Sequence, residues 1–537
     1  MDRSDAVPEK IPTGEVGFAA LARLVPSSAG YYLDETGSMV IRVRDRDEFE
    51  AARSAYSTAV SMEQRSYARG GVRIVTADYS YGYLAKQREA VFENLFGSVR
   101  GVTSLDLNEA RNRVVIGIDK SMAAQASAQL EEAIVRHGLD RQAIEFKPEE
   151  PMRPAAGSSS FGRRASMLLP SNLDGVFTTL VGGINIHVSA TDPMVGNNGA
   201  DGECSLGFTT TYTPAGGGAS YPAIVTNTHC TQIWGAPDST ALRQGPLGAR
   251  TYFGYSTVDP HKTYCAGNWC RMADAALFKI TSGSIDVGLI ARTAPGSINL
   301  DAASPYFVVK DVATSSLPMG TTYHRIGHTT GWVTGITVQT CIDHHLGYAW
   351  PDQYVTRCGD TGTASAQDGD SGGSVFVRLD SNNVRLIGIT VGNNGTAPGS
   401  AHLWSPYDRI VANLGGTFQV VRPATLLPPS TIAGSVSSIP GTAFVCWSSA
   451  SGASEYELQG EDWQQQCDPY WGCNVVNVGT WKVRVVGTSY TDTRSIFHSV
   501  VPSGTPAYTY TKYRVLSKNP MTGSFSLLGD SVRFAHY

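Results

Sequence analysis

The chain has 537 residues, which predicts more than one domain. Its net charge of −5 argues against a general nucleic-acid-binding protein, and it lacks a run of about 18 apolar residues that could cross a membrane. With 57 glycines and only 17% charged residues, the composition is typical of a β-rich secreted protein.

Residues 1–150 contain no cysteine and predict an α+β region in which one unit occurs twice. Period-2 alternation predicts hairpins at 31–43 and 105–118, and Ala/Glu/Gln/Arg-rich stretches predict a helix after each, at 47–60 and 121–137. Two closing strands and a helix between the units are predicted at 72–75, 143–146 and 87–96. Each unit is therefore ββαβ-like. An unrelated α/β binding module is the alternative interpretation.

Residues 151–179 predict a linker, because prolines, a glycine and a run of serines are concentrated there. The pair Arg163-Arg164 would suit a trypsin-like processing cut, although paired arginines in linkers are common without any such meaning. We expect maturation to cleave the chain between residues 155 and 182.

Residues 180–420 predict all-β barrels, because short strands recur with turn signals between them. Examples lie at 206–211, 223–228, 275–280, 334–339 and 384–390. One helix is predicted near the end of the region, with Ser405 as its cap, Pro406 in its first turn and Gly415 as its stop.

Two residues in this region suit acid–base chemistry. A β-branched strand, residues 224–228, leads into the pair His229-Cys230, and a strand end is a rigid mount that opens into a cleft. Asp274 leads directly into the apolar strand at 275–280. A carboxylate that enters a core needs a partner, and an imidazole N–H is a suitable one.

The run Asp368-Gly369-Asp370-Ser371-Gly372-Gly373-Ser374 predicts a nucleophile. A serine hydroxyl attacks poorly unless a neighbouring base takes its proton. The flanking glycines allow a sharp turn, which can aim the N–H groups of Gly369 and Ser371 at one carbonyl oxygen. A bare Gly-Asp-Ser-Gly is as often a flexible loop, so the matching histidine and aspartate decide the interpretation.

The order His229, Asp274, Ser371 resembles the chymotrypsin-like serine proteases, and within them the bacterial secreted streptogrisin and alpha-lytic protease type. Three further segments match that family in the same order over about residues 180–415, namely 203–208, 325–331 and 388–392. The resemblance implies a double β-barrel core in which these three residues are catalytic. It implies no metal and no cofactor.

The resemblance also assigns residues around the triad. The backbone of Gly369 and Ser371 would form the oxyanion hole, and Arg325 would form a structural ion pair with Asp370. The strand that lines the specificity pocket would present Thr390, Val391, Gly392 and Asn393. Protein or peptide substrates are the implied partners.

The chain departs from the family pattern in several places. Thr228 stands where a small Ala or Gly is usual, and Ser374 replaces a usual Pro. Val391 replaces a Ser that normally supports the buried Asp, and Asn393 replaces a Gly of the pocket wall. The loop from 358 to 369 is longer than in the small streptogrisins. None of these changes removes a catalytic group, but they leave the pocket specificity unassigned.

The nine cysteines all lie between residues 204 and 473, which favours disulfides in an oxidising compartment. By resemblance Cys204 pairs with Cys230; the further pairs expected are Cys265–Cys270, Cys341–Cys358 and Cys467–Cys473, with Cys446 left over. A zinc site is the weaker alternative, since no CxxC pair occurs and the one His beside a Cys is His229.

Prolines and a Ser/Gly-rich run predict a second linker at 421–435. Residues 436–537 then alternate and are aromatic-rich, as a β-sandwich requires. Their pattern resembles fibronectin type III domains, which are mostly spacers or adhesion modules. Trp463, Tyr470 and Trp471 could stack on a surface or polysaccharide ligand, although aromatic residues of a sandwich more often form its core.

By resemblance, residues 1–150 are a pro-region that assists folding and acts as an intramolecular inhibitor until it is cut away. A pre-formed sheet edge could template a β protein with many non-local contacts. We expect a secreted, monomeric serine endopeptidase made as a zymogen, although no signal peptide is visible. The alternatives are an inactive protease fold that binds through the C-terminal domain, and an esterase, which the order His229, Asp274, Ser371 disfavours because esterases and lipases have the order Ser, Asp, His.

Overall fold

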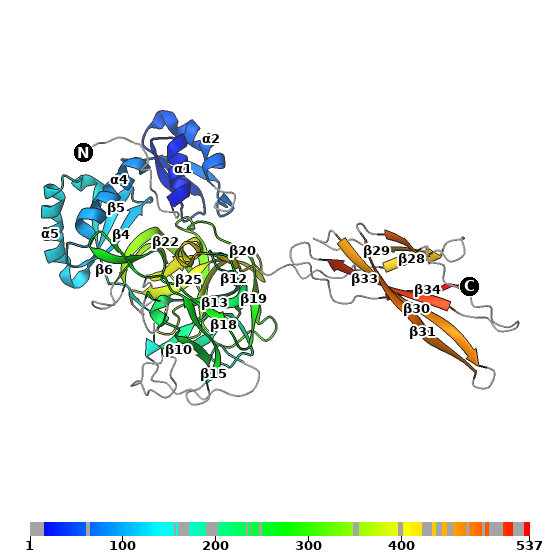
Figure 1. The fold of residues 1–537 in the computed structure, drawn as a ribbon. Coiled ribbons are helices and arrows are strands. Elements are labelled where there is room, and N and C mark those ends of the chain that lie inside the picture. The colour runs from blue at the N-terminus through cyan, green and yellow to red at the C-terminus, as the bar shows by residue number, and fades with distance from the viewer. Residues whose placement is uncertain are drawn as a thin grey trace. The chain divides into compact units, whose positions relative to one another are not determined.

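The computed structural model is mostly β-sheet with few helices (Figure 1). It divides into two compact units, Met1–Arg422 and Pro423–Tyr537. It describes residues 15–60, 65–154, 157–158, 171–189, 202–231, 235–236, 238–245, 250–346, 354–395, 401–421 and the backbone of the strands between 432 and 536. No helix among these residues is long and apolar enough to cross a membrane.

The first part of the N-terminal region contains a three-stranded sheet in the order β1-β2-β3. The hairpin β1 (Ser28–Leu33) and β2 (Met39–Val43) is antiparallel, whereas β2 and β3 (Val72–Thr76) are parallel. The helix α2 (Phe49–Ala59) supplies the crossover that a parallel pair requires. Helix α1 (Val16–Leu24) precedes the sheet and packs against β1 and α2.

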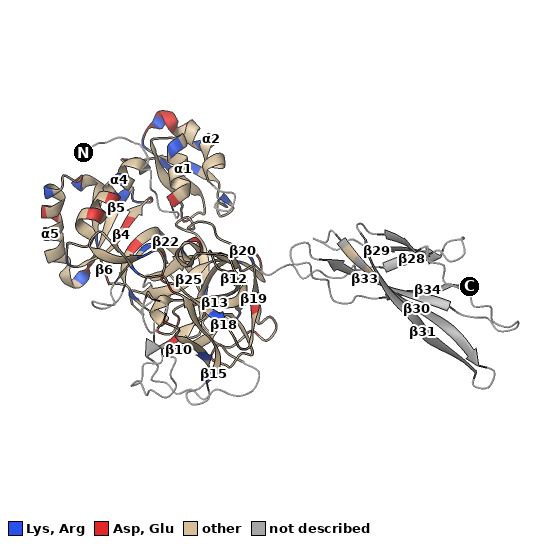
Figure 2. Cartoon of the chain, in the orientation of Figure 1, with Lys and Arg blue, Asp and Glu red and all other residues tan. Residues whose placement is uncertain are grey.

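A second unit of the same order follows, with β4 (Val102–Asn108), β5 (Arg113–Asp119), α5 (Ala123–Arg136) and β6 (Ile144–Glu149). The apolar positions of α5 recur at helical spacing, so Ala126, Leu130, Ala133 and Ile134 are buried. Its outer face carries both signs of charge, which Figure 2 shows for α2 as well. The connecting helix α4 (Tyr81–Val91), which continues as a π-helical turn at Phe92–Phe96, starts earlier than predicted because Ser80 caps its N-terminus.

The next region forms two large sheets. The first has nine strands in the order β27-β12-β13-β18-β15-β14-β10-β11-β8. These strands are β8 (Gly157–Ser158), β10 (Asn185–Ser189), β11 (Gly202–Ser205), β12 (Phe208–Thr213), β13 (Tyr221–Thr226), β14 (Ala241–Gln244), β15 (Thr251–Val258), β18 (Ala276–Ile280) and β27 (Thr417–Gln419).

The second large sheet has fifteen strands and includes β4, β5 and β6 of the N-terminal region. Its other members are β7 (Arg153–Pro154), β9 (Thr179–Gly182), β16 (Thr263–Cys265), β17 (Asn268–Arg271), β19 (Ser284–Ala291), β20 (Tyr306–Val312), β21 (Thr322–Gly327), β22 (Gly331–Leu346), β23 (Tyr354–Gly362), β24 (Ser374–Arg378), β25 (Asn383–Asn393) and β26 (His402–Pro406).

The N-terminal region joins this sheet through one edge strand, because β4 pairs antiparallel with β22. The registered pairs are Leu105 with Asp343 and Ser104 with His344. The buried Arg88 of α4 adds an ion pair of 3.0 Å to Asp343. Backbone pairing at a sheet edge is a strong mode of docking, because each N–H and C=O group that is removed from water forms a hydrogen bond with the neighbouring strand.

A single helix, α6 (Tyr407–Leu414), follows β26 and ends at Gly415, which has a φ of +66°. The predicted cap at Ser405 is wrong, because Ser405 belongs to β26 and Pro406 occupies the N-cap position without a side-chain hydrogen bond. The Ser405 hydroxyl is instead directed to Asp274.

The C-terminal unit contains one sheet of three strands and one of four. The first has the order β28-β29-β32, and the second has the order β31-β30-β33-β34. Their bounds are β28 (Ile432–Val436), β29 (Ala443–Trp447), β30 (Glu455–Asp468), β31 (Gly472–Val485), β32 (Ser489–Asp492), β33 (Thr509–Lys518) and β34 (Ser531–His536). The side chains described here are the buried Tyr456 and Leu458; those of Cys446, Trp463, Tyr470 and Trp471 lie outside the described residues.

Candidate active site

Two neighbouring strands bring His229 and Asp274 together. His229 lies in the short 3-10 turn Thr228–Cys230 that follows β13, and Asp274 lies just before β18. Because β13 and β18 pair antiparallel, with Thr226 opposite Ala276, the end of one strand lies beside the start of the other. Residues 45 apart in sequence thereby become hydrogen-bonding partners.

The Asp274 carboxylate is held on both of its oxygens. Oδ2 is hydrogen-bonded to Nδ1 of His229, and Oδ1 accepts the backbone N–H groups of Thr228 at 2.9 Å and His229 at 3.2 Å. Complete burial acts to raise the pKa of Asp274, but the charge and hydrogen bonds of His229, aided by Arg271, outweigh it and lower the pKa. Asp274 is thus kept ionised against the imidazole.

The Ser371 hydroxyl lies on the other side of that imidazole, with 2.7 Å between its Oγ and Nε2 of His229. The Ser371 loop is fixed to β25, because Gly372 donates to the Thr390 carbonyl and Thr390 donates to that of Gly373, both at 2.8 Å. Ser371 is 0% exposed and His229 is 4% exposed. The three predicted triad residues therefore form one continuous hydrogen-bonded chain in a closed site.

The predicted oxyanion donors lie in the same turn. Gly369 has a φ of +95°, and the Asp368 carbonyl, which shares a peptide group with the Gly369 N–H, accepts the Thr329 hydroxyl at 2.8 Å, so this N–H is held in orientation. A Cβ at this position would come within 2.5 Å of the His328 ring. Within the described part of the chain, the N–H groups of Gly369 and Ser371 have no acceptor, which leaves both available to a carbonyl oxygen.

Arg325 and Asp370 form a buried ion pair of 3.2 Å, with both side chains 0% exposed. The Asp370 carboxylate also accepts the Thr330 hydroxyl at 2.8 Å and the backbone N–H groups of Gln367, Thr329 and Thr330 at 2.9 to 3.2 Å. A buried charge pair is retained only where its remaining hydrogen bonds are satisfied. This network fixes the residue that precedes Ser371.

A second buried ion pair, which the sequence did not predict, lies behind His229. Arg271 donates to Asp259 at 2.8 Å, and Thr228 donates its hydroxyl to the same carboxylate. Burial raises the pKa of Asp259 to about 6, against the opposing effect of Arg271. The unusual Thr228 was the available signal, since a hydroxyl in place of a small apolar residue next to His229 needs a partner.

Two other residues that depart from the family pattern, Ser374 and Asn393, also form hydrogen bonds. The Ser374 hydroxyl donates to the Gly207 carbonyl, and the Asn393 amide donates to the Ala366 carbonyl at 2.8 Å. Asp274 donates its backbone N–H to the Ser405 hydroxyl at 3.0 Å. The buried Tyr354 has a pKa raised well above its usual value, by burial and then by the charge of nearby Asp274. Tyr354 of β23 and Ser405 of β26 thus place polar groups near Asp274, whereas the apolar Val391 supplies none.

The predicted pocket residues Thr390, Val391, Gly392 and Asn393 form the end of β25 and are all buried. Thr390 lies 3.2 Å from Nε2 of the buried His402. Gly392 and Asn393 are paired antiparallel with β7. The start of the predicted linker is therefore a strand, because it pairs with an edge of β25. The composition of the linker does not reveal such an edge.

Three disulfides join the predicted partners Cys204–Cys230, Cys265–Cys270 and Cys341–Cys358. Cys204, His229 and Cys230 lie close enough together to hold a metal, but both sulfurs are in a disulfide and the imidazole is in the triad. The residues present thus do not fit a metal. For Cys467 and Cys473, only the opposed backbone positions in β30 and β31 are described.

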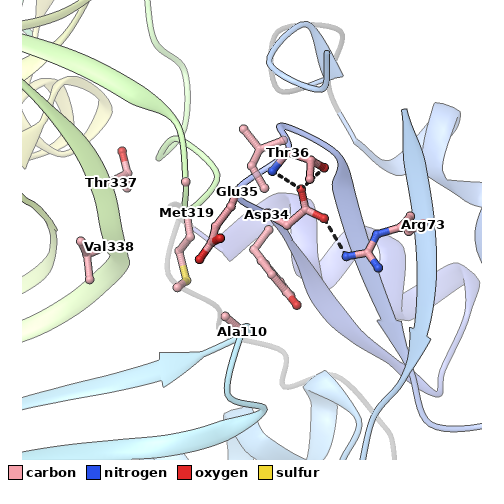
Figure 3. Close-up of a pocket in the computed structure, with 11 residues that line it drawn as sticks. Asp34, Glu35, Thr36, Arg73, Ala110, Met319, Thr337 and Val338 are labelled. Atoms are coloured by element: carbon pink, nitrogen blue, oxygen red, sulfur yellow. Dashed lines mark hydrogen bonds and ion pairs between the residues drawn. The ribbon is translucent and has the colours of Figure 1, made fainter. Parts of the chain in front are cut away.

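An open pocket of about 540 Å³ lies away from the triad, between the first small sheet and β22 (Figure 3). Its wall includes Asp34, whose carboxylate accepts Thr36 at 2.6 Å and Arg73 at 2.6 Å. These hydrogen bonds, that from Thr36 first, lower the pKa of Asp34 to about 2. No triad residue lines this pocket, so it is a feature of the junction between the N-terminal region and the second large sheet.

No protein-family model and no curated protein matches the chain. Among solved structures, the Nocardiopsis protease NAPase is 21% identical over 45% of this chain and 99% of its own, with a TM-score of 0.30. Thermobifida fusca protease A is 20% identical over 45% and 99%, with a TM-score of 0.30. A Fn3-like protein from Clostridium thermocellum is 20% identical over 20% and 92%, with a TM-score of 0.13. At such scores the function has to be argued from this chain's own side chains.

Proposed function

We propose that the chain is the precursor of a secreted serine endopeptidase, which hydrolyses peptide bonds through an acyl-enzyme on Ser371. The observation that carries the proposal is the hydrogen-bonded series in which His229 contacts Ser371 Oγ at 2.7 Å and is bonded to Asp274 through Nδ1. A nucleophile, a base and a group that orients the base are the parts that activate a serine.

The first step would be attack of Ser371 Oγ on the scissile carbonyl while His229 Nε2 takes the hydroxyl proton. Asp274 holds the imidazole with Nε2 free to accept and stabilises the positive charge that develops on it. The carbonyl oxygen becomes negative as it is attacked. The N–H groups of Gly369 and Ser371 would stabilise it, an effect of about 3 to 4 kcal/mol per donor.

The second step would break the carbon–nitrogen bond. His229 returns the proton to the leaving amine, which departs and leaves an ester on Ser371. Water then attacks this ester with His229 again as the base, and the released product carries a carboxylate. Each step uses the residues already described and needs no group beyond water.

The described state suits a zymogen. Ser371 is 0% exposed, so an external protein cannot reach its hydroxyl in this arrangement. The chain that precedes the catalytic region occupies the edge of β25, where an extended substrate would pair. We therefore infer that the N-terminal region, residues 1–150, and its connection inhibit the enzyme until they are removed, and that activation is the removal of a steric block.

The test is labelling of the purified full chain and of its processed form with a fluorophosphonate probe, followed by digestion of casein. We expect labelling at Ser371 and cleavage of casein by the processed form, with both abolished in Ser371→Ala. Labelling without cleavage of casein, together with hydrolysis of short esters, would instead indicate an esterase. No labelling of a folded, processed chain would leave a binding protein that has a protease fold.

A further inference from the structure

The turn at Gly369 is held on both sides by side chains of the catalytic region. The Thr329 hydroxyl donates to the Asp368 carbonyl at 2.8 Å, and this carbonyl shares a planar peptide group with the Gly369 N–H. The Ser205 hydroxyl donates to the Gly369 carbonyl at 2.9 Å and accepts the backbone N–H of His328 at 2.9 Å. Both peptide groups of Gly369 are therefore tied to the segment that carries His328.

The imidazole of His328 fills the space beside the Gly369 Cα. A Cβ at residue 369 would lie 2.5 Å from Nε2 and 3.0 Å from Cε1 of this ring. The φ of Gly369 is +95°, and glycine has more conformational freedom than any other residue. A turn at a glycine keeps one conformation only where its surroundings leave no room for another. The buried His328 ring supplies that boundary together with the Thr329 hydroxyl.

Asp174 fixes the other side of the same ring, with 2.9 Å between its Oδ1 and Nδ1 of His328. The segment that carries Asp174 is itself anchored. The Asp174 N–H donates to the side-chain oxygen of Asn172 at 3.1 Å, and the Leu173 N–H donates to the Ile298 carbonyl at 2.9 Å. Leu173 is 0% exposed in the core of the catalytic region. The ring of His328 is thus held between this anchored carboxylate and the turn at Gly369.

The hydrogen bond to Asp174 also decides how the ring faces Gly369. A carboxylate accepts, so Nδ1 is the donor and Nε2 is the nitrogen on the Gly369 side. Within the part of the chain that the structure describes, Nε2 of His328 is buried and has no hydrogen-bond partner. An unpaired buried nitrogen lowers the stability of a fold and calls for an explanation. Contact with the turn that carries the oxyanion donor supplies one.

We propose that His328, oriented by Asp174, is a positioning residue for the oxyanion donor at Gly369. The inference rests on the proposed endopeptidase function. A neutral substrate carbonyl is a weaker acceptor than the negatively charged oxygen of the transition state. A donor that points in the wrong direction therefore loses more in the transition state than in the bound substrate. Loss of the His328 ring should lower kcat and leave KM nearly unchanged.

The first test removes the ring from the processed enzyme. His328→Ala leaves a void beside Gly369, and we expect kcat for a peptide nitroanilide to fall by at least about tenfold while KM changes by less than about threefold. Added imidazole should restore part of the lost kcat, because a free ring fits the void, and should not raise the kcat of wild type. His261→Ala makes the same change at an exposed histidine of the catalytic region and should keep the wild-type kcat.

The second test measures the oxyanion site itself with a peptide aldehyde. The aldehyde carbon bonds to Ser371 Oγ, and the resulting hemiacetal oxygen occupies the place of the oxyanion. We expect the inhibition constant of the aldehyde to rise in His328→Ala by the factor by which kcat/KM falls. Active sites are counted by titration with the fluorophosphonate. A variant that is only less stable would therefore keep the wild-type inhibition constant.

A double-mutant cycle tests Asp174. Asp174→Asn weakens the hydrogen bond to the His328 ring and should lower kcat in the same way, by a smaller factor than His328→Ala. The double variant should lose no more than His328→Ala alone, because Asp174 acts through His328. Asp380→Asn, at an exposed aspartate of the same region, should leave kcat unchanged. If His328→Ala does not fold, Asp174→Asn provides the same comparison of kcat, KM and aldehyde affinity.

The inference is wrong if a folded, labelled His328→Ala enzyme keeps the wild-type kcat and aldehyde affinity, or if its KM rises while kcat is unchanged. Losses that add in the double variant, or an active processed form that lacks Asp174, would contradict the role of Asp174. Failure of the proposed function is distinct. In that case the folded, processed wild type is neither labelled at Ser371 nor able to hydrolyse the nitroanilide, and the role of His328 fails with it.

Discussion

The hydroxyl of Thr228 donates to the Asp259 carboxylate, with 2.8 and 2.6 Å to its two oxygens. The same carboxylate is paired with the buried Arg271 at 2.8 Å. Thr228 directly precedes His229, so this pair anchors the backbone that carries the proposed base. A residue that departs from the family pattern is thus part of a charged network that supports the site.

Thr228→Ala should weaken the fold because it removes a hydrogen bond from a buried charged acceptor. We expect the free energy of unfolding to fall by about 1 to 3 kcal/mol, measured by urea denaturation of the full chain in a Ser371→Ala background. Thr228→Ser keeps the hydroxyl and is the matched control, with most of the stability retained. Equal unfolding midpoints for the Ala and Ser variants would show that the hydroxyl contributes nothing.

Arg325→Met should be much more disruptive, because it leaves Asp370 buried without its cation. Removing one partner of a buried ion pair costs about 3 to 5 kcal/mol. Denaturant unfolding of the full chain in the Ser371→Ala background checks this, and Arg292→Met, which removes a partly exposed arginine, is the control. If Arg325→Met folds with unchanged stability, and the same change in the active chain leaves its kinetics unchanged, the structural role assigned to the pair is wrong.

Asp274→Asn should leave the fold in place and remove most of the activity. An amide at this position favours the wrong imidazole tautomer, and the resulting loss in kcat is about 10⁴-fold. Hydrolysis of a peptide nitroanilide by the processed enzyme measures it. Asp380→Asn makes the same chemical change at an exposed position between β24 and β25, in the part of the chain that the processed enzyme keeps, and should have full activity. A loss of less than tenfold in Asp274→Asn would argue against the assigned role.

Acid should destabilise the full chain through His344, which lies in β22 opposite Ser104 of β4. Burial lowers the pKa of His344 from 6.5 to about 4, with Glu149, Lys147, Asp343 and His345 as its charged neighbours. Between pH 6.5 and pH 4 the unfolded chain therefore binds a proton that the folded chain does not. The stability contributed by neutral His344 is present above pH 6.5 and falls as the pH decreases, by about 2 kcal/mol between pH 8 and pH 5.

Urea denaturation of the Ser371→Ala chain at both pH values measures this difference. His344→Gln cannot take up the proton, so its stability should change less between pH 8 and pH 5. His137→Gln removes an exposed histidine and should keep the wild-type dependence. If His344→Gln loses as much stability in acid as His137→Gln does, the dependence arises elsewhere.

Much of the candidate site could be predicted because its signals are local. A β-branched strand that ends in His229, an aspartate that enters an apolar strand and a serine between glycines are patterns of a few residues each. The paired units of the N-terminal region were predictable for the same reason, since the periods of strands and helices are written along the chain. The prediction failed at Ser405, because a serine before a helix can act as a cap or form another hydrogen bond. Its hydroxyl accepts the backbone N–H of Asp274 instead of capping the helix.

The sequence by itself determined which groups are available, and in which order: a base, a carboxylate, a nucleophile and cysteines with partners at suitable spacing. The tertiary structure decided what each group contacts. It paired Arg153 with Asn393 in neighbouring strands and placed the Thr228 hydroxyl in hydrogen-bonding distance of Asp259. Strand edges and buried charges have partners that are distant in the sequence, so the sequence alone does not identify them. The composition of residues 151–179 predicts a linker. Part of that segment is nevertheless the strand β7, because an edge of β25 is available for it to pair with.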